Sequence, residues 1–158
     1  MSTATRTRTP RFNHVAMSVP ADLLDEQGRA DLLAFYGDVF GWDELPTETK
    51  DRYRLVMRAH DNEQFVFLIA EDSPMSCPRL DHFGMSVGSA EELEEIYAKA
   101  QAWAAKDDRV DLIEKKGEDM HGVLVLTSFY VRFLLPMMVE VQHWNWKDAS
   151  RAPAAREA

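Results

Sequence analysis

Cysteine is nearly absent from this sequence, with Cys77 as the single one among 158 residues. One cysteine cannot form a disulfide within the chain, and a lack of disulfides is typical of a reducing compartment. A chain of this length buries about 70% of its unfolded surface on folding, so it needs neither disulfides nor a metal for stability. We therefore expect a cytoplasmic protein in which Cys77 is a structural thiol.

Long hydrophobic runs and excess positive charge are also missing. No segment approaches the roughly 20 apolar residues of a membrane-spanning helix. The first eleven residues lack the apolar centre of a signal peptide. The 27 acidic and 18 basic residues give a formal net charge of −9. Because such a surface repels phosphate backbones and anionic lipids, we expect neither nucleic acid nor a membrane as a partner.

Both ends of the chain lack a hydrophobic period. Residues 1–11 and 147–158 are rich in Ala, Arg, Pro, Ser and Thr, which predicts two disordered tails. The whole chain is 46% hydrophobic and 28% charged, which is the balance of a globular protein. The folded part is therefore expected between the tails.

An internal repeat divides this folded part. Phe12–Val19 aligns with Leu80–Val87, with identical His, Met, Ser and Val at four of the eight positions. A helical pattern follows in each copy, with a Tyr six residues before a Trp: Tyr36 and Trp42, Tyr97 and Trp103. Two matches in the same order predict a duplication, with modules at 12–79 and 80–146.

Each module is expected to begin with a strand and a helix and to continue with three strands. Runs rich in apolar and β-branched residues predict these later strands at 42–48, 53–60, 64–71, 110–116, 122–134 and 137–144. The sequence therefore predicts an α+β fold made of two βαβββ modules in tandem.

The first strand of each module has two different faces. One face is apolar in both copies, whereas the other carries His14 or His82 beside small residues: Ala16 and Ser18, Gly84 and Ser86. A face buried in a core would be filled by branched side chains. The small residues leave open space, so the histidine faces are expected to line a cavity.

The last strand carries a carboxylate in an apolar setting. Glu140 lies mid-strand between Val139 and Val141, where a free carboxylate is costly to desolvate without a partner. A metal ion would supply the opposite charge. His14, His82 and Glu140 then form a set of two histidines and one carboxylate, which suits Fe(II) or Mn(II) with open coordination positions.

These residues resemble the vicinal oxygen chelate superfamily, which includes glyoxalases, bleomycin-resistance proteins and extradiol dioxygenases. The resemblance covers nearly the whole chain between the tails. It implies that the two modules form a cupped mixed β-sheet around one divalent metal, with the helices outside. It implies His14, His82 and Glu140 as metal ligands, a small-molecule substrate and a homodimer.

The resemblance leaves the fourth ligand position open. Aligning Phe65–Leu68 with Met138–Val141 places Phe67 there, and Phe67 cannot bind a metal, whereas Glu71 lies four residues on along the same face. Three protein ligands resemble a ring-cleaving dioxygenase with Fe(II) or Mn(II), which is the favoured prediction. Glu71 as a fourth ligand would resemble a glyoxalase-like lyase or isomerase, for which Zn(II) or Ni(II) is an alternative.

The resemblance also implies residues around the metal. Tyr130 precedes Glu140 by a spacing similar to that of a pocket tyrosine in extradiol dioxygenases, and His121 falls where those enzymes can carry a substrate-contacting histidine. Both are expected to be catalytic. By alternation Ser128 and Arg132 share a face with Tyr130, so they are expected to bind substrate oxygens.

A function of another class stays open at this point. Resistance proteins with this fold bind a toxic ligand without catalysis and usually lack an intact ligand set. The presence of all three predicted ligands favours a metal-dependent enzyme over such a ligand-sequestering protein.

Overall fold

The structure, a computed structural model, describes residues 10–152. Residues 1–9 and 153–158, which make up much of the two predicted tails, lie outside the described residues. Within the described part of the C-terminal segment, Ala149–Arg151 form a 3-10 helix.

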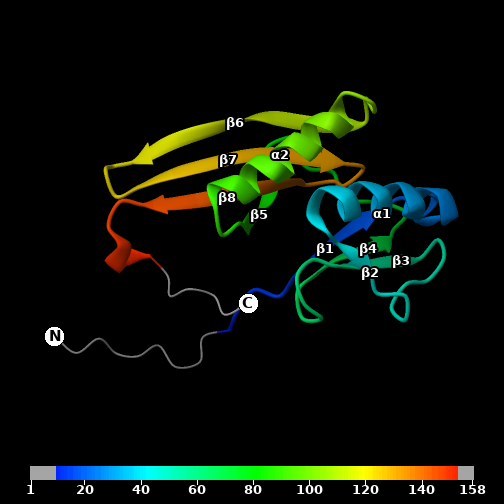
Figure 1. The fold of residues 1–158 in the computed structure, drawn as a ribbon. Helices are drawn as coiled ribbons and strands as arrows, with labels where there is room; N and C mark the ends of the chain where they lie inside the picture. Colours follow the sequence, from blue (N-terminus) through cyan, green and yellow to red (C-terminus); the bar gives the residue numbers. More distant parts are fainter. Residues whose placement is uncertain (1–9, 153–158) are drawn as a thin grey trace.

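The first module is a four-stranded sheet with one covering helix (Figure 1). Its strands lie in the order β1-β4-β3-β2, and β1 runs parallel to β4. In chain order its elements are β1 (His14–Val19), a 3-10 helix (Ala21–Leu24), α1 (Glu26–Phe40), β2 (Asp43–Glu44), β3 (Arg54–Arg58) and β4 (Phe65–Ala70).

The second module repeats this arrangement, with strand order β5-β8-β7-β6 and β5 parallel to β8. The predicted α+β fold of two βαβββ modules in tandem is therefore confirmed. Within one chain the strands form two separate mixed sheets. The elements of this module are β5 (His82–Ser86), α2 (Ala90–Ala104), β6 (Val110–Met120), β7 (Leu124–Phe133) and β8 (Met138–Trp146).

Strand lengths differ most from the sequence prediction at two places. β2 is only two residues long, because turns occupy most of the segment after Glu44. β6 reaches Met120 instead of ending at 116, because its polar second half pairs with β7 along a long hairpin. Backbone pairing rather than side-chain hydrophobicity decides both of these ends.

Local side-chain contacts explain where the helices begin. At α1, Asp25 Oδ1 accepts the Gly28 N–H at 2.8 Å. At α2, Ser89 Oγ accepts the Glu92 N–H at 3.1 Å, and the Glu92 carboxylate accepts the Gly88 N–H at 2.8 Å. These contacts satisfy backbone donors that have no partner within the helix.

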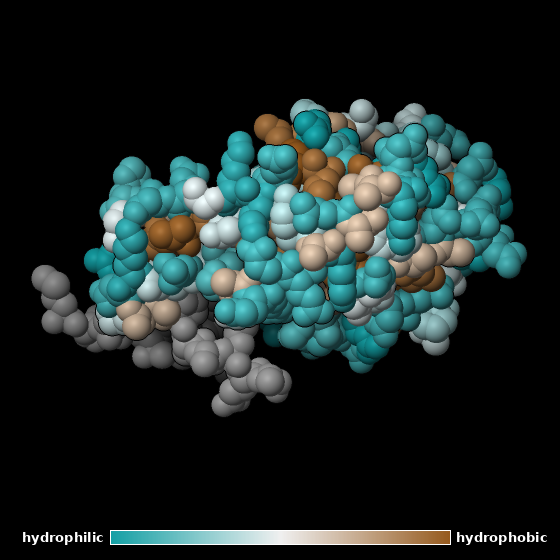
Figure 2. Space-filling model, turned by 45° about the horizontal axis from the view of Figure 1, so that its top comes forward, coloured by the Kyte–Doolittle hydropathy of each residue, from teal (hydrophilic) through white to brown (hydrophobic). Residues whose placement is uncertain are grey.

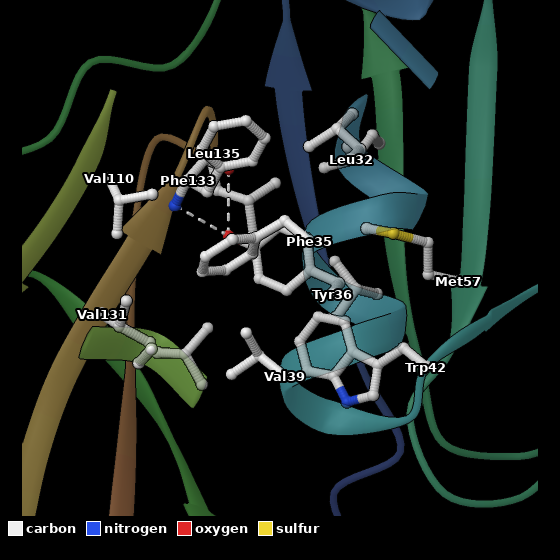
Figure 3. Packing of buried hydrophobic residues seen from close by; sticks show 14 of the residues in the cluster. Leu32, Phe35, Tyr36, Val39, Trp42, Met57, Val110, Val131, Phe133 and Leu135 are labelled. Carbon is white, nitrogen blue, oxygen red and sulfur yellow. Dashed lines mark hydrogen bonds between the residues drawn. The ribbon is translucent and has the colours of Figure 1, made fainter. Parts of the chain in front are cut away.

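One hydrophobic core joins the modules (Figure 3). Phe35 of α1 stacks on Phe133 of β7 and meets Trp103 of α2 edge-on, with centroid distances of 4.9 and 5.4 Å. The buried Tyr36 hydroxyl donates to the Phe133 carbonyl and accepts the Phe133 N–H, both at 3.1 Å. Burial raises the pKa of Tyr36, so its hydroxyl keeps the proton that this donation requires.

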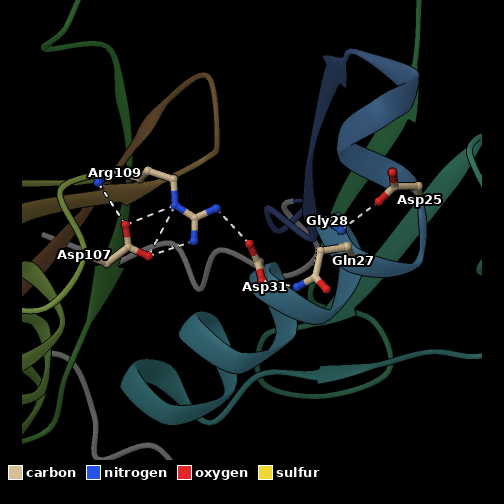
Figure 4. Close-up of polar contacts among 6 residues, drawn as sticks. All are labelled: Asp25, Gln27, Gly28, Asp31, Asp107 and Arg109. Atoms are coloured by element: carbon tan, nitrogen blue, oxygen red, sulfur yellow. Dashed lines mark hydrogen bonds and ion pairs between the residues drawn. The ribbon is translucent and has the colours of Figure 1, made fainter.

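Polar contacts add a second link between the modules (Figure 4). Arg109, just before β6, donates to Asp31 of α1 at 2.8 Å and to Asp107 at 2.7 Å. Its hydrogen bonds hold the pKa of both carboxyls below the usual value. The face seen in Figure 2 is mostly hydrophilic with small apolar patches, which agrees with the acidic composition.

Candidate metal centre

The structure brings His82 and Glu140 together on the second sheet. β5 and β8 are parallel neighbours, with His82 opposite Met138 and Gly84 opposite Glu140. His82 Nε2 lies 3.3 Å from Glu140 Oε2. Two ligands bound at right angles to one ion, each about 2.1 Å away, lie about 3.0 Å apart, so this separation fits a shared metal.

The orientation of His82 also fits metal binding. Its Nδ1 lies 2.7 Å from the carbonyl oxygen of Leu80. Because a carbonyl only accepts, Nδ1 carries a proton, so in a neutral ring the lone pair that binds a metal is on Nε2. A backbone carbonyl holding the second ring nitrogen is the usual arrangement around a metal-binding histidine.

Glu140 is the only buried charged residue in the described part of the chain, with 5% exposure. Its Oε2 accepts a hydrogen bond of 2.7 Å from the side-chain amide of Gln142. The Gln142 amide oxygen in turn accepts the indole N–H of Trp144 at 3.1 Å. Sequence reasoning missed Gln142 as a functional residue, although the i, i+2, i+4 spacing of these three residues on one strand face could have indicated it.

Tyr130 lies beside both residues. It is directly opposite Glu140 across the β7–β8 pair, and its ring meets the His82 ring edge-on at 5.1 Å. The pKa of Tyr130 is raised above its usual value, mainly by a hydrogen bond to Glu140 and to a smaller extent by burial. The phenol is therefore protonated at neutral pH and can donate a proton to a bound oxygen.

The two predicted substrate-binding residues share this face but differ in their partners. Ser128 lies opposite Gln142 on β8. Arg132 donates to Asp111 at 2.9 Å and to the Pro136 carbonyl at 3.1 Å. These contacts hold Arg132 to its own chain, so its guanidinium is less available to a substrate than the sequence suggests.

His121 does not join the other predicted residues within the chain. It lies in the exposed turn between β6 and β7 with a left-handed φ of 53°. The seven strand residues from Leu124 to Tyr130 alone span about 20 Å, six steps of about 3.3 Å each. The structure therefore does not place His121 beside Tyr130, because the spacing in sequence reflects a long hairpin rather than one pocket.

His14 is the ligand that the chain itself does not bring to this site. It begins β1 of the first sheet, where its exposed ring stacks on Phe65 at 4.8 Å and Nδ1 lies 2.9 Å from Asn13 Oδ1. Among residues 10–152, no group of three His, Cys, Asp or Glu side chains has an arrangement that could hold a metal. One chain thus contains the predicted ligands as a pair, His82 and Glu140, and a separate His14.

The strand register identifies the residue of the first module that corresponds to Glu140. Phe67 of β4 lies opposite Ala16, just as Glu140 lies opposite Gly84. Glu71 is exposed and lies one residue beyond the end of β4. Phe67 therefore occupies the equivalent position, which agrees with a set of three protein ligands.

Two cavities lie beside the predicted ligands. One, of about 370 Å³, covers the open face of the second sheet and is lined by residues that include His82, Leu126, Ser128 and Tyr130. Another, of about 380 Å³, lies between the modules beside His14 and Phe83. Both volumes suit a small molecule.

No protein-family model matches the sequence, and no curated protein matches it significantly. Solved structures do match. A possible glyoxalase from Bacillus cereus is 20% identical, with 84% of this chain and 98% of that chain covered and a TM-score of 0.56. A lactoylglutathione lyase from Agrobacterium tumefaciens is 16% identical, with 87% and 96% covered and a TM-score of 0.58.

A third similar structure contains a metal. This variant of the fosfomycin resistance protein FosX from Listeria monocytogenes, in complex with Mn(II) and 1S,2S-dihydroxypropylphosphonic acid, is 15% identical, with 86% and 93% covered and a TM-score of 0.58. These proteins belong to the vicinal oxygen chelate superfamily. The chain has their fold. Within the described residues, no helix is long and apolar enough to cross a membrane.

Proposed function

We propose that this protein is a metal-dependent enzyme that acts on a small substrate with two vicinal oxygens. The observation that carries the proposal is the 3.3 Å approach of His82 Nε2 to the buried Glu140 carboxylate, with His82 Nδ1 held by a backbone carbonyl. A buried carboxylate beside an imidazole whose Nδ1 faces a carbonyl is a donor pair that suits a divalent metal.

The third ligand in this proposal is His14 of a second copy. His14 is exposed on the first module and separate from the pair on the second module. In a twofold dimer, each chain would give His14 to one site and His82 with Glu140 to the other. Two complete sites would then form from two chains, each between the first module of one chain and the second module of the other.

The favoured ions are Fe(II) and Mn(II), with Zn(II) and Ni(II) as alternatives. Two histidines and one carboxylate suit the first two ions, and the similar FosX variant was solved with Mn(II). When bound, such an ion polarises the substrate oxygens and stabilises negative charge on them. The raised pKa of Tyr130 keeps its phenol protonated, so Tyr130 can deliver or hold a proton at one of these oxygens.

Two reaction classes fit this site. A lyase or isomerase reaction needs proton transfer, for which Tyr130 is placed, and the similar structures include a lactoylglutathione lyase. A set of three protein ligands by itself resembles the ring-cleaving dioxygenase predicted from the sequence, but the second catalytic residue predicted for that reaction, His121, lies in a distant turn. We therefore favour proton-transfer chemistry. Oxygen uptake with catechols would reverse this preference, whereas turnover of α-oxo or α-hydroxy acids without oxygen would support it.

The first test is the metal content of protein purified without chelators or metal columns. We expect about one metal per predicted site in the parent, and its loss in His82→Ala. His143→Ala is the matched control, because His143 lies on the same strand but points to the other face. The absence of metal from the parent, with no uptake of Mn(II) or Fe(II), would contradict the enzyme proposal and favour a ligand-sequestering protein.

The second test asks whether the site is shared between chains. The His14→Ala and His82→Ala proteins are each expected to bind no metal. They are mixed in equal amounts, unfolded and refolded together. If the ligands of a site come from two chains, random pairing restores roughly one quarter of the sites. Half of the dimers then contain one chain of each variant, and one of the two sites in such a dimer is intact. A site formed within one chain would give no recovery.

A further inference from the structure

The open face of the second sheet continues past the candidate metal ligands to an apolar end. Trp144 and Trp146 of β8 stack there with a centroid distance of 5.9 Å and an interplanar angle of 24°. Across the strand pair, Leu126 lies opposite Trp144 and Leu124 lies opposite Trp146. Trp144 is 42% exposed, so a large aromatic face remains accessible to a ligand.

This apolar end is connected to the candidate metal centre. The Trp144 indole N–H donates to Gln142, and Gln142 donates to Glu140, so the indole leans along β8 toward the carboxylate. Leu126, the cross-strand partner of Trp144, also lines the 370 Å³ cavity that contains His82. The cavity and the tryptophan pair therefore meet at Leu126.

We propose that Trp144 and Trp146, together with Leu126, form a subsite for a flat aromatic group of the substrate. This inference rests on the proposed function, since the substrate's two vicinal oxygens would reach the metal at His82 and Glu140. A small ligand rather than a second protein is the expected occupant, because the hydrogen-bonded row from Trp144 ends on a candidate ligand and the adjoining cavity has the volume of a small molecule.

The test compares mandelate with lactate, two α-hydroxy acids that present the same vicinal oxygens and differ in a phenyl or methyl group. Their affinities for Mn(II)-loaded protein are measured by isothermal titration calorimetry. An aromatic contact contributes enough to predict about 5- to 10-fold tighter binding of mandelate. Trp144→Ala should reduce this ratio to below about twofold, and Trp144→Phe, which keeps a ring, should retain most of it.

The control variant is Tyr53→Ala, which removes an exposed aromatic residue of the first module and should leave the ratio unchanged. Equal affinity for the two acids in the parent, or a ratio unaffected by Trp144→Ala, would overturn the subsite. A change from dimer to monomer in Trp144→Ala, measured by analytical ultracentrifugation, would also overturn it by identifying an interface between copies.

Failure of the subsite and failure of the proposed function give different results. Metal binding in the parent with no preference for the phenyl group rejects the subsite alone. The titrations are repeated on metal-free protein, where a phenyl preference that depends on Trp144 supports an aromatic site even if no metal binds. Loss of both the metal and the preference rejects both proposals.

Discussion

At the scale of single residues, the environment of Glu140 is the most informative feature. A carboxylate with 5% exposure needs compensation for its lost hydration, and Gln142, His82 and Tyr130 surround it. Gln142 has a particular part in this arrangement. Its amide uses one end to hold Glu140 and the other to accept from Trp144, which fixes its own orientation.

The Gln142→Leu variant tests Gln142 as a positioning residue for Glu140. We expect the affinity for Mn(II) to fall about 10- to 100-fold, as is usual when a partner of a metal ligand is removed. The affinity is measured by titration followed by electron paramagnetic resonance. Asn145→Leu, a similar change at an exposed position of the same strand, is the control and should leave the affinity unchanged. Equal affinities in the parent and Gln142→Leu would contradict this role.

At the scale of secondary-structure elements, a close backbone contact decides how α1 begins. The 3-10 helix Ala21–Leu24 turns directly into α1, and Gly28 lies against its backbone. A Cβ at position 28 would lie 2.2 Å from the Leu23 carbonyl oxygen, which is far inside contact distance. Glycine is therefore required there by space, although the backbone of Gly28 is helical.

The Gly28→Ala variant should consequently be destabilised, although alanine favours helices. The helix propensity gain of about 1 kcal/mol is smaller than the cost of displacing the backbone, so we expect a net loss of about 1–3 kcal/mol in the free energy of unfolding. Gly37→Ala in the same helix is the control. Its Cβ would lie 3.3 Å from the Trp42 carbonyl oxygen, so the net change should be near zero. Urea unfolding measures both variants, and equal stabilities would refute the steric explanation.

At the scale of the whole molecule, a shared core and the Arg109 contacts fix the two modules to one another. The same arrangement keeps His14 away from His82 and Glu140, since the open faces belong to two separate sheets. The proposed dimer follows from this separation. A rigid connection between modules within each chain would let a second copy meet both open faces at once.

The Tyr36→Phe variant tests the connection between the modules. It would leave the buried N–H and carbonyl of Phe133 without their partner, which we expect to cost about 1–3 kcal/mol in the free energy of unfolding. Tyr97→Phe removes the hydroxyl of the corresponding tyrosine in the second module of the same chain. That hydroxyl accepts a single long bond of 3.5 Å, so the change should be smaller. Denaturation followed by circular dichroism compares the two, and a larger loss in Tyr97→Phe would contradict this interpretation.

Much of this molecule could be predicted from the sequence. The repeat of the histidine strands determined the two βαβββ modules. The alternation along these strands determined the apolar faces under the helices and the small-residue faces around His14 and His82, because side-chain direction in a strand follows from spacing alone. The equivalence of Phe67 and Glu140 also followed from the repeat, and the register agrees with it.

Only the tertiary structure decided which of these residues meet. β5 and β7 both pair with β8, which brings together His82, Tyr130 and Glu140. His121 lies far from them at the end of the long β6–β7 hairpin, whose polar half shows no clear hydrophobic pattern in the sequence. His14 is separated from Glu140 by the packing of one module against the other. These outcomes depend on contacts between segments far apart in the chain, and spacing within a strand does not specify such contacts.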